Sequence, residues 1–76
     1  MKTIGDILKE IRPEFDFNSS MDFIGDGMLD SFDVVTLVSA LDKAYGISIP
    51  GVDIVPEHFT NLQTIEGLLR KCGAQP

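Results

Sequence analysis

Ser31 is the side chain in this sequence that is best placed to carry a chemical group. It lies in the stretch Gly27–Phe32 (GMLDSF), with Asp30 before it and Asp33 two residues after it. The stretch opens the strongest predicted helix, and the free N–H groups and positive dipole of a helix N-terminus stabilise a phosphate. A phosphoester on the Ser31 hydroxyl is therefore well placed, although a serine at a helix start is more often only a cap or a filler.

Catalytic side chains are not indicated by the remaining residues. The sequence has one histidine, His58, and one cysteine, Cys72. No set of residues in the sequence resembles an array of a nucleophile, a base and an orienting group. We therefore predict no catalytic residue, no metal site and a protein that is not an enzyme.

The segment from Asp22 to Asp33 offers an alternative, because its acids partly follow the spacing of an EF-hand calcium loop. Asp22, Asp26 and Asp30 fall at the first, fifth and ninth positions of that loop. Ile24 stands where the third ligand should be, and no helix is predicted before Asp22. These acids are better explained as solvated loop residues and as caps of the following helix, so calcium binding is a distant alternative.

Three amphipathic helices are predicted around this segment from apolar residues that repeat every three to four positions. The expected boundary residues are Thr3 and Pro13, then Asp30 and Gly46, then Thr60 or Asn61. The residues expected to form the core are Ile7, Leu8, Ile11, Leu37, Val38, Leu41, Ile65 and Leu69.

The connections complete the predicted fold. Residues Glu14–Leu29 form a long first loop whose aromatic residues should fold onto the core, and a loop of this length is often functional. Val55–Phe59 is expected to be one short helical turn, with Pro56 near its start. The sequence thus predicts one all-α domain over residues 1–76: a small bundle of four helices, three long and one short, with a long first loop.

Composition and charge exclude several functions. The chain of 76 residues carries twelve acids and six bases, a net charge of −6, and between Glu14 and Leu69 it has ten acids and only one base, Lys43. Such a surface suits basic partners and is unsuited to nucleic acid. No apolar run approaches the ~20 residues of a membrane span, so no membrane insertion is expected. One cysteine excludes an internal disulfide and favours a reducing, cytoplasmic setting. A monomer is the default expectation for so small and charged a domain.

An ordered set of motifs resembles the acyl carrier and peptidyl carrier protein family over nearly the whole chain. The set comprises Gly25–Phe32, then Leu37–Leu41 up to Tyr45–Ile47, then Ile49-Pro50, and finally Asp53 before a closing amphipathic helix. The resemblance implies the family's four-helix bundle. It also implies that Ser31, which matches the family's modified serine, carries 4′-phosphopantetheine, with Asp30 and Phe32 beside it.

The resemblance also implies a mechanism. A phosphopantetheinyl transferase uses Mg²⁺ and coenzyme A to place the arm on the serine, and the terminal thiol of the arm then holds acyl or aminoacyl groups as thioesters. The carrier delivers them to loading ligases, acyltransferases and synthases, as in fatty acid biosynthesis and other lipid metabolism. The residues that we expect to dock these partners are Asp26, Met28, Leu29, Asp33, Val35 and Asp42.

Two alternatives remain open, one for the cargo of the carrier and one for the carrier function itself. Thr36 and Lys43 occupy positions that are commonly acidic in the carriers of fatty acid synthesis, whereas Gly27–Ser31 and Ile49–Phe59 look closer to stand-alone carriers such as the D-alanyl carriers. The cargo could therefore be D-alanyl or another aminoacyl group. A plain helical adaptor is a further alternative, and for it Ser31→Ala would have no effect.

Overall fold

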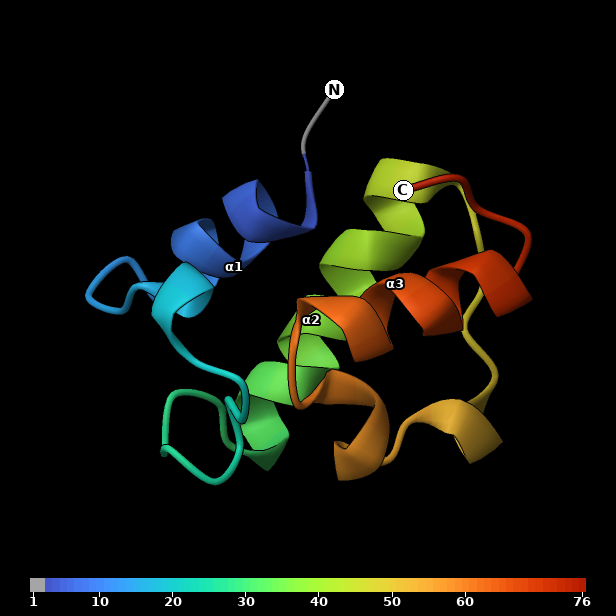
Figure 1. The fold of residues 1–76 in the computed structure, drawn as a ribbon. Coiled ribbons are helices and arrows are strands. Elements are labelled where there is room, and N and C mark those ends of the chain that lie inside the picture. The colour runs from blue at the N-terminus through green and yellow to red at the C-terminus, as the bar shows by residue number, and fades with distance from the viewer. Residues whose placement is uncertain (1–2) are drawn as a thin grey trace.

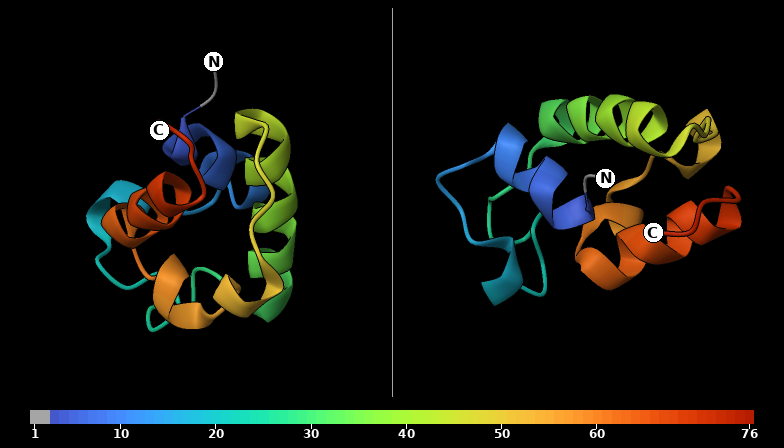
Figure 2. Two further views of the ribbon diagram at one scale, coloured as in Figure 1. Left: turned by 90° about the vertical axis from the view of Figure 1, so that its right-hand side faces the viewer. Right: turned by 90° about the horizontal axis from the view of Figure 1, so that it is seen from above.

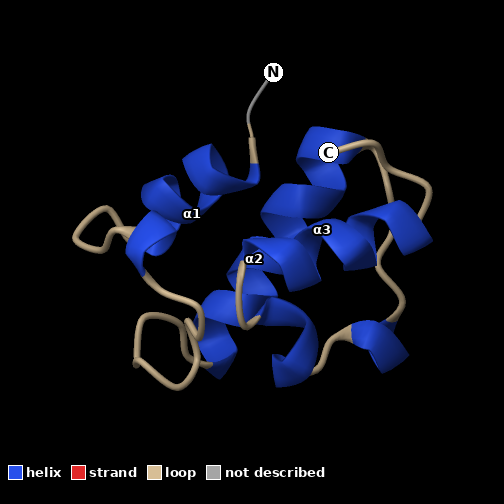
Figure 3. Ribbon diagram, in the orientation of Figure 1, coloured by secondary structure: helices blue, strands red, loops and turns tan. Residues whose placement is uncertain are grey.

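Helices make up the framework of the protein, for which a computed structural model describes residues 3–76. Within that range the chain has three α-helices and no strand: α1 (Ile4–Ile11), α2 (Ser31–Tyr45) and α3 (Leu62–Lys71) (Figures 1 and 3). Three short 3₁₀ turns lie between them: η1 (Phe17–Ser19), η2 (Gly51–Asp53) and η3 (Pro56–Phe59). The predicted all-α class is therefore confirmed.

The predicted short fourth helix is not confirmed as an α-helix. The segment Pro56–Phe59 is a four-residue 3₁₀ turn that begins with proline at its first position. A segment of this length holds only one turn, and short connecting turns commonly adopt 3₁₀ geometry with its tighter hydrogen bonds. The fold thus has three α-helices, and η3 takes the place of the expected short helix.

Side-chain caps set the beginnings of the helices as the sequence predicts. Thr3 Oγ1 accepts the Asp6 N–H at 3.1 Å, and the Asp6 carboxylate accepts the Thr3 N–H at 3.1 Å, which starts α1. Asn61 begins α3 in the same way, because its Oδ1 accepts the Thr64 N–H at 2.9 Å. Gly46 ends α2 with a φ of 64°, in the left-handed region that glycine adopts without strain.

The core lies between the three helices and η3 (Figure 2). α1 contacts both α2 and α3, and η3 contacts both α2 and α3, so that η3 fills the gap between the two longer helices. Phe59 of η3 has no exposed surface. Of the eight residues predicted for the core, seven are buried and Ile11 is half-buried against them. The described chain measures 28 × 26 × 20 Å.

The long first loop folds onto this core, as its aromatic content predicts. The rings of Phe17 and Phe23 meet edge to face with centroids 5.0 Å apart, and both are buried. The Phe23 N–H donates to the Thr60 carbonyl at 2.6 Å, and the Phe23 carbonyl accepts the N–H groups of Met28 and Leu29. One residue thus fixes the loop to the segment before α3 and to the segment before α2.

None of the helices in the part of the chain described here combines the length and the hydropathy that crossing a bilayer requires.

Candidate functional site

Ser31 is the first residue of α2, and its side chain is exposed. Asp30 precedes it in extended conformation and caps the helix: its Oδ1 accepts the Asp33 N–H at 2.8 Å. In return, Asp33 Oδ2 accepts the Asp30 N–H at 3.2 Å. The predicted capping roles of both acids are confirmed. The first N–H groups of the helix, those of Ser31 and Phe32, precede its first internal hydrogen bonds and can therefore bind an anionic oxygen.

Arg12 reaches this turn from the end of α1, and the sequence analysis did not single it out. Its Nε and Nη2 lie 2.9 and 2.8 Å from Asp33 Oδ2. Burial alone would raise the pKa of the Asp33 carboxyl, but hydrogen bonds from Arg12 and the Asp30 N–H outweigh it and lower this pKa below its ordinary value of 3.8. The sequence did contain a signal, because Asp33 lies one turn before the core residue Leu37, and an acid on a buried stripe needs a cation.

Apolar side chains lie next to Ser31. Phe32 and Val35 project outward with 78% and 63% of their surface exposed. Beside them lies a hollow of about 190 Å³ lined by Ser31, Val34, Val35, Ile54 and Pro56. The fully buried residues of the core do not line this hollow. It is therefore a surface hollow between α2 and the segment 54–56, and it places apolar walls next to the serine.

The segment that forms one wall of the hollow is held by Asp53. The Lys71 Nζ of α3 donates to Asp53 Oδ1 at 2.9 Å, and the Asp53 side chain is only 10% exposed. His58 Nδ1 lies 2.8 Å from the Asp53 carbonyl oxygen. These contacts fix Ile54 and Pro56 relative to α3. The sequence analysis did not assign this pairing, since Asp53 and Lys71 are distant in the chain.

Met28 and Leu29, which were expected to dock partners, are buried in the structure. They are 7% and 2% exposed, because their N–H groups bind the Phe23 carbonyl and their side chains turn into the core. Buried side chains offer little surface to another protein, so we withdraw them as docking residues.

The two acids of α2 are also engaged within the molecule. The Asp33 side chain is 9% exposed and binds Arg12. Asp42 is half-buried, and its Oδ1 accepts the Ile49 N–H at 3.0 Å, which fixes the chain after α2. Both were expected to dock partners electrostatically. The contacts of Asp33 and Asp42 within the molecule explain these two acids without a partner. Both carboxylates are thus engaged, and the exposed side chains of α2 nearest Ser31, Phe32 and Val35, are apolar.

The acids of the long loop do not form the calcium site considered as an alternative. Asp22 Oδ1 accepts the Gly25 N–H at 2.8 Å, Asp26 Oδ2 accepts the Ser20 hydroxyl at 2.5 Å, and Asp30 caps α2. Each carboxylate thus serves a local turn or cap. Among residues 3–76 no three histidine, cysteine, aspartate or glutamate side chains lie together as metal ligands would. Asp26 itself is exposed and remains available to partners.

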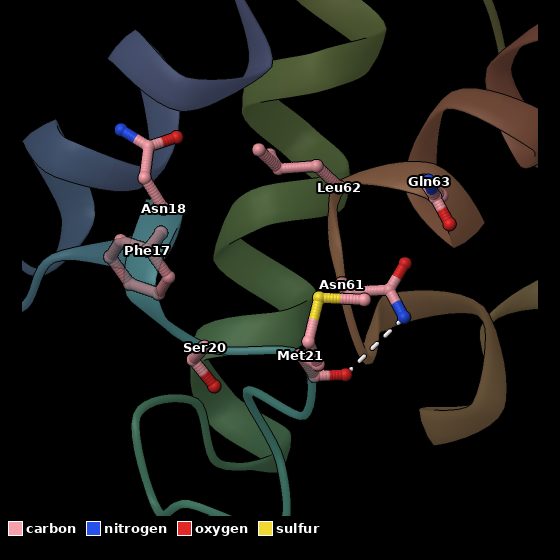
Figure 4. Close-up of a pocket in the computed structure, with 7 residues that line it drawn as sticks. All are labelled: Phe17, Asn18, Ser20, Met21, Asn61, Leu62 and Gln63. Atoms are coloured by element: carbon pink, nitrogen blue, oxygen red, sulfur yellow. Dashed lines mark hydrogen bonds between the residues drawn. The ribbon is translucent and has the colours of Figure 1, made fainter.

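Another hollow, of about 180 Å³, lies between η1 and the start of α3 (Figure 4). Phe17 and Leu62 form apolar walls, Met21 lies at its edge with 70% of its surface exposed, and Asn61 Nδ2 donates to the Met21 carbonyl at 3.3 Å. No ionisable side chain lines this hollow, and Ser31 is not part of it. It therefore offers packing surface, and the hydroxyl of Ser20, which lines it, is engaged with Asp26.

A family model described as "phosphopantetheine attachment site" matches residues 1–71. The comparisons with curated proteins and with solved structures gave no match.

Proposed function

We propose that this chain, which belongs to the phosphopantetheine attachment site family, bears its 4′-phosphopantetheine on Ser31. Members of the family carry this group covalently and are carriers without catalytic activity, so the chain is a carrier and not an enzyme. The family also interacts with phosphopantetheinyl transferases and partner enzymes. The attachment residue, the cargo and the particular partners are our proposals.

The observation that carries the assignment of Ser31 is its exposed hydroxyl on the first turn of α2. Backbone N–H groups there can hold the phosphate, while Asp30 and Asp33 fix the turn by capping each other. The adjacent hollow, with Val34, Val35 and Ile54, provides an apolar surface for the arm. The residues around Ser31 thus fit a covalently attached 4′-phosphopantetheine. When attached, it supplies a thiol on a flexible arm, where acyl or aminoacyl groups are held as thioesters.

We further propose that the cargo is short. Leu37, Leu41 and Phe59 have no exposed surface, and none of them lines the hollow beside Ser31. A long acyl chain would have to displace these side chains to enter the core, and a close-packed core resists such insertion. A D-alanyl or other small aminoacyl group, or a short acyl group, stays outside the core and requires no displacement. This favours a stand-alone carrier over a carrier of long fatty acyl chains.

The partners that we propose are a phosphopantetheinyl transferase, an acyl- or aminoacyl-loading ligase, and an acyltransferase or synthase. Phe32 and Val35 supply an apolar contact beside the serine, and Asp26 supplies an exposed carboxylate. Asp30, with a side chain 63% exposed, faces outward next to the modified residue and is proposed to contact the transferase. A cytoplasmic monomer suits the single cysteine and the net charge of −6.

Intact mass spectrometry tests the attachment residue. The protein is incubated with coenzyme A, Mg²⁺ and a broad-specificity phosphopantetheinyl transferase. Wild type and Ser39→Ala, which changes another exposed serine of α2, should each gain the mass of one phosphopantetheine. Ser31→Ala should gain nothing and should keep its helical circular dichroism spectrum. Modification of Ser31→Ala, or no modification of folded wild type, contradicts the proposal.

A further inference from the structure

Arg12 connects the end of α1 to the turn that presents Ser31. Its Nε and Nη2 both contact Asp33 Oδ2, at 2.9 and 2.8 Å, and Nη2 lies 3.7 Å from Asp30 Oδ2. The Arg12 side chain is 35% exposed and that of Asp33 is 9% exposed. The contact is therefore largely shielded on the Asp33 side, where a charged hydrogen bond is stronger than at an open surface.

Two of the carboxylates that Arg12 approaches, those of Asp30 and Asp33, belong to the cap of α2. Asp33 Oδ2 accepts the Asp30 N–H, and Asp30 Oδ1 accepts the Asp33 N–H, with Ser31 between the two residues. Without Arg12, the buried Asp33 carboxylate would lose two of its donors and would have to turn toward water or take up a proton. Either change weakens the hydrogen bond that Asp33 Oδ2 accepts from the Asp30 N–H, and so loosens one half of the cap beside the serine.

Arg12 also offsets negative charge next to the hydroxyl. Its Nη1 lies 3.4 Å from Glu14 Oε2, so three carboxylates surround one guanidinium. Coenzyme A carries an anionic diphosphate at the atom that the Ser31 hydroxyl must reach. Removal of the guanidinium leaves three uncompensated carboxylates near that approach, and repulsion then opposes the encounter.

We propose that Arg12 is a positioning residue for the modification of Ser31, because it holds the first turn of α2 and neutralises the carboxylates around it. The inference rests on the proposed attachment at Ser31. In that reaction a bond forms between Ser31 Oγ and the phosphorus that bears the pantetheine, and the diphosphate P–O bond of coenzyme A breaks. Adenosine 3′,5′-bisphosphate leaves, and the hydroxyl proton passes to a base of the transferase. Arg12 forms and breaks no bond.

Steady-state modification kinetics test this role. Wild type, Arg12→Gln, Arg12→Lys and Lys9→Gln are compared with the broad-specificity transferase, coenzyme A and Mg²⁺. Lys9→Gln removes one exposed cation from the last turn of the same helix and is the matched control for net charge. We expect kcat/KM for the carrier to fall about tenfold or more in Arg12→Gln, because small misplacement of a reacting group has effects of this size. Arg12→Lys should recover part of the loss, and Lys9→Gln should stay close to wild type.

Two further readouts separate positioning from a general loss of stability. The KM for coenzyme A should stay unchanged in all variants. Added salt should reduce the difference in kcat/KM between wild type and Arg12→Gln, because it screens the charges. Amide hydrogen exchange of the apo protein should be faster at Asp30 and Asp33, whose N–H groups form the cap, in Arg12→Gln, while the amides of α3 stay protected. If Arg12→Gln does not fold, Arg12→Lys carries the comparison.

The outcomes are distinct. Equal kcat/KM for Arg12→Gln and Lys9→Gln, or unchanged exchange at Asp30 and Asp33, overturns the role of Arg12. An unmodified wild type overturns the proposed attachment site instead, and in that case the hydrogen-exchange comparison still decides whether Arg12 holds the turn.

Discussion

The length of the acyl chain on the arm provides the sharpest test of the proposed short cargo. Two loaded forms of the protein are compared, one with acetyl and one with octanoyl as the thioester. If the core admitted the longer chain, about six additional methylene groups would leave water. At about 0.8 kcal/mol for each buried methylene, the gain would be about 5 kcal/mol.

The structure predicts a much smaller gain in stability from the octanoyl chain. The hollow beside Ser31 is about 190 Å³ and reaches the core only at Val34, while none of the fully buried core residues lines it. Leu37, Leu41 and Phe59, each with no exposed surface, would have to move before the chain could go deeper. We therefore expect partial contact with Val34 and Ile54 and a gain of about 1 kcal/mol or less.

Thermal unfolding followed by far-UV circular dichroism distinguishes the two cases. For a domain of this size about 1 kcal/mol shifts the Tm by about 4–8 °C, so full insertion would raise the Tm of the octanoyl form by about 20 °C or more. We expect the acetyl and octanoyl forms to differ by less than about 8 °C. A difference above about 15 °C would show that the core opens, and the argument for a short cargo would be wrong. Phe59→Leu serves as a control, because a smaller side chain there makes room for the chain and should increase the dependence on chain length.

Three other predictions concern the turn around Ser31. The pKa of Asp33 is lowered in the folded protein. Its ionised carboxylate therefore stabilises the fold fully at pH values above the pKa of the unfolded chain, about 3.9. This stabilisation is lost as the pH falls through the lower pKa of the folded protein. The difference in urea midpoint between wild type and Arg12→Gln should therefore be large at neutral pH and shrink below about pH 4, and a constant difference down to the lowest pH would contradict it. Asp30→Ala should lose about 1 kcal/mol through loss of the helix cap, whereas Asp30→Ser, which retains a capping oxygen, should lose much less. If the Asp30 carboxylate also contacts the transferase, both Asp30 variants should be modified more slowly, and equal rates for wild type and Asp30→Ser would refute that contact.

The parts of the fold that depend on neighbouring residues were predictable from the sequence. Thr3, Asp30 and Asn61 begin their helices through side chains that bind N–H groups three residues away, and Gly46 ends α2 because it adopts a positive φ. These are short-range effects that the residue types themselves indicate. The exposed position of Ser31 followed from the same local reasoning.

The parts that depend on distant residues were not predictable in this way. Arg12 and Asp33 meet only because α1 packs against α2, and Asp53 meets Lys71 only because η2 lies against the end of α3. The burial of Met28 likewise depends on how the long loop folds back. In each case the sequence shows a charge or an apolar group, whereas its partner becomes known only from the tertiary arrangement.

The hydrogen bonds of Phe23 have a consequence for the order in which the chain folds. The cap of α2 joins residues only three positions apart, so its first turn can begin to form early, before Arg12 of α1 reaches Asp33 and holds it. The long loop is different, because Phe23 binds the carbonyl of Thr60, which lies in the second half of the chain. Closing so large a loop has an entropic cost that only the collapsed core can offset. The helix that presents Ser31 should therefore form early in folding, and the loop that leads into it should be among the last parts to settle.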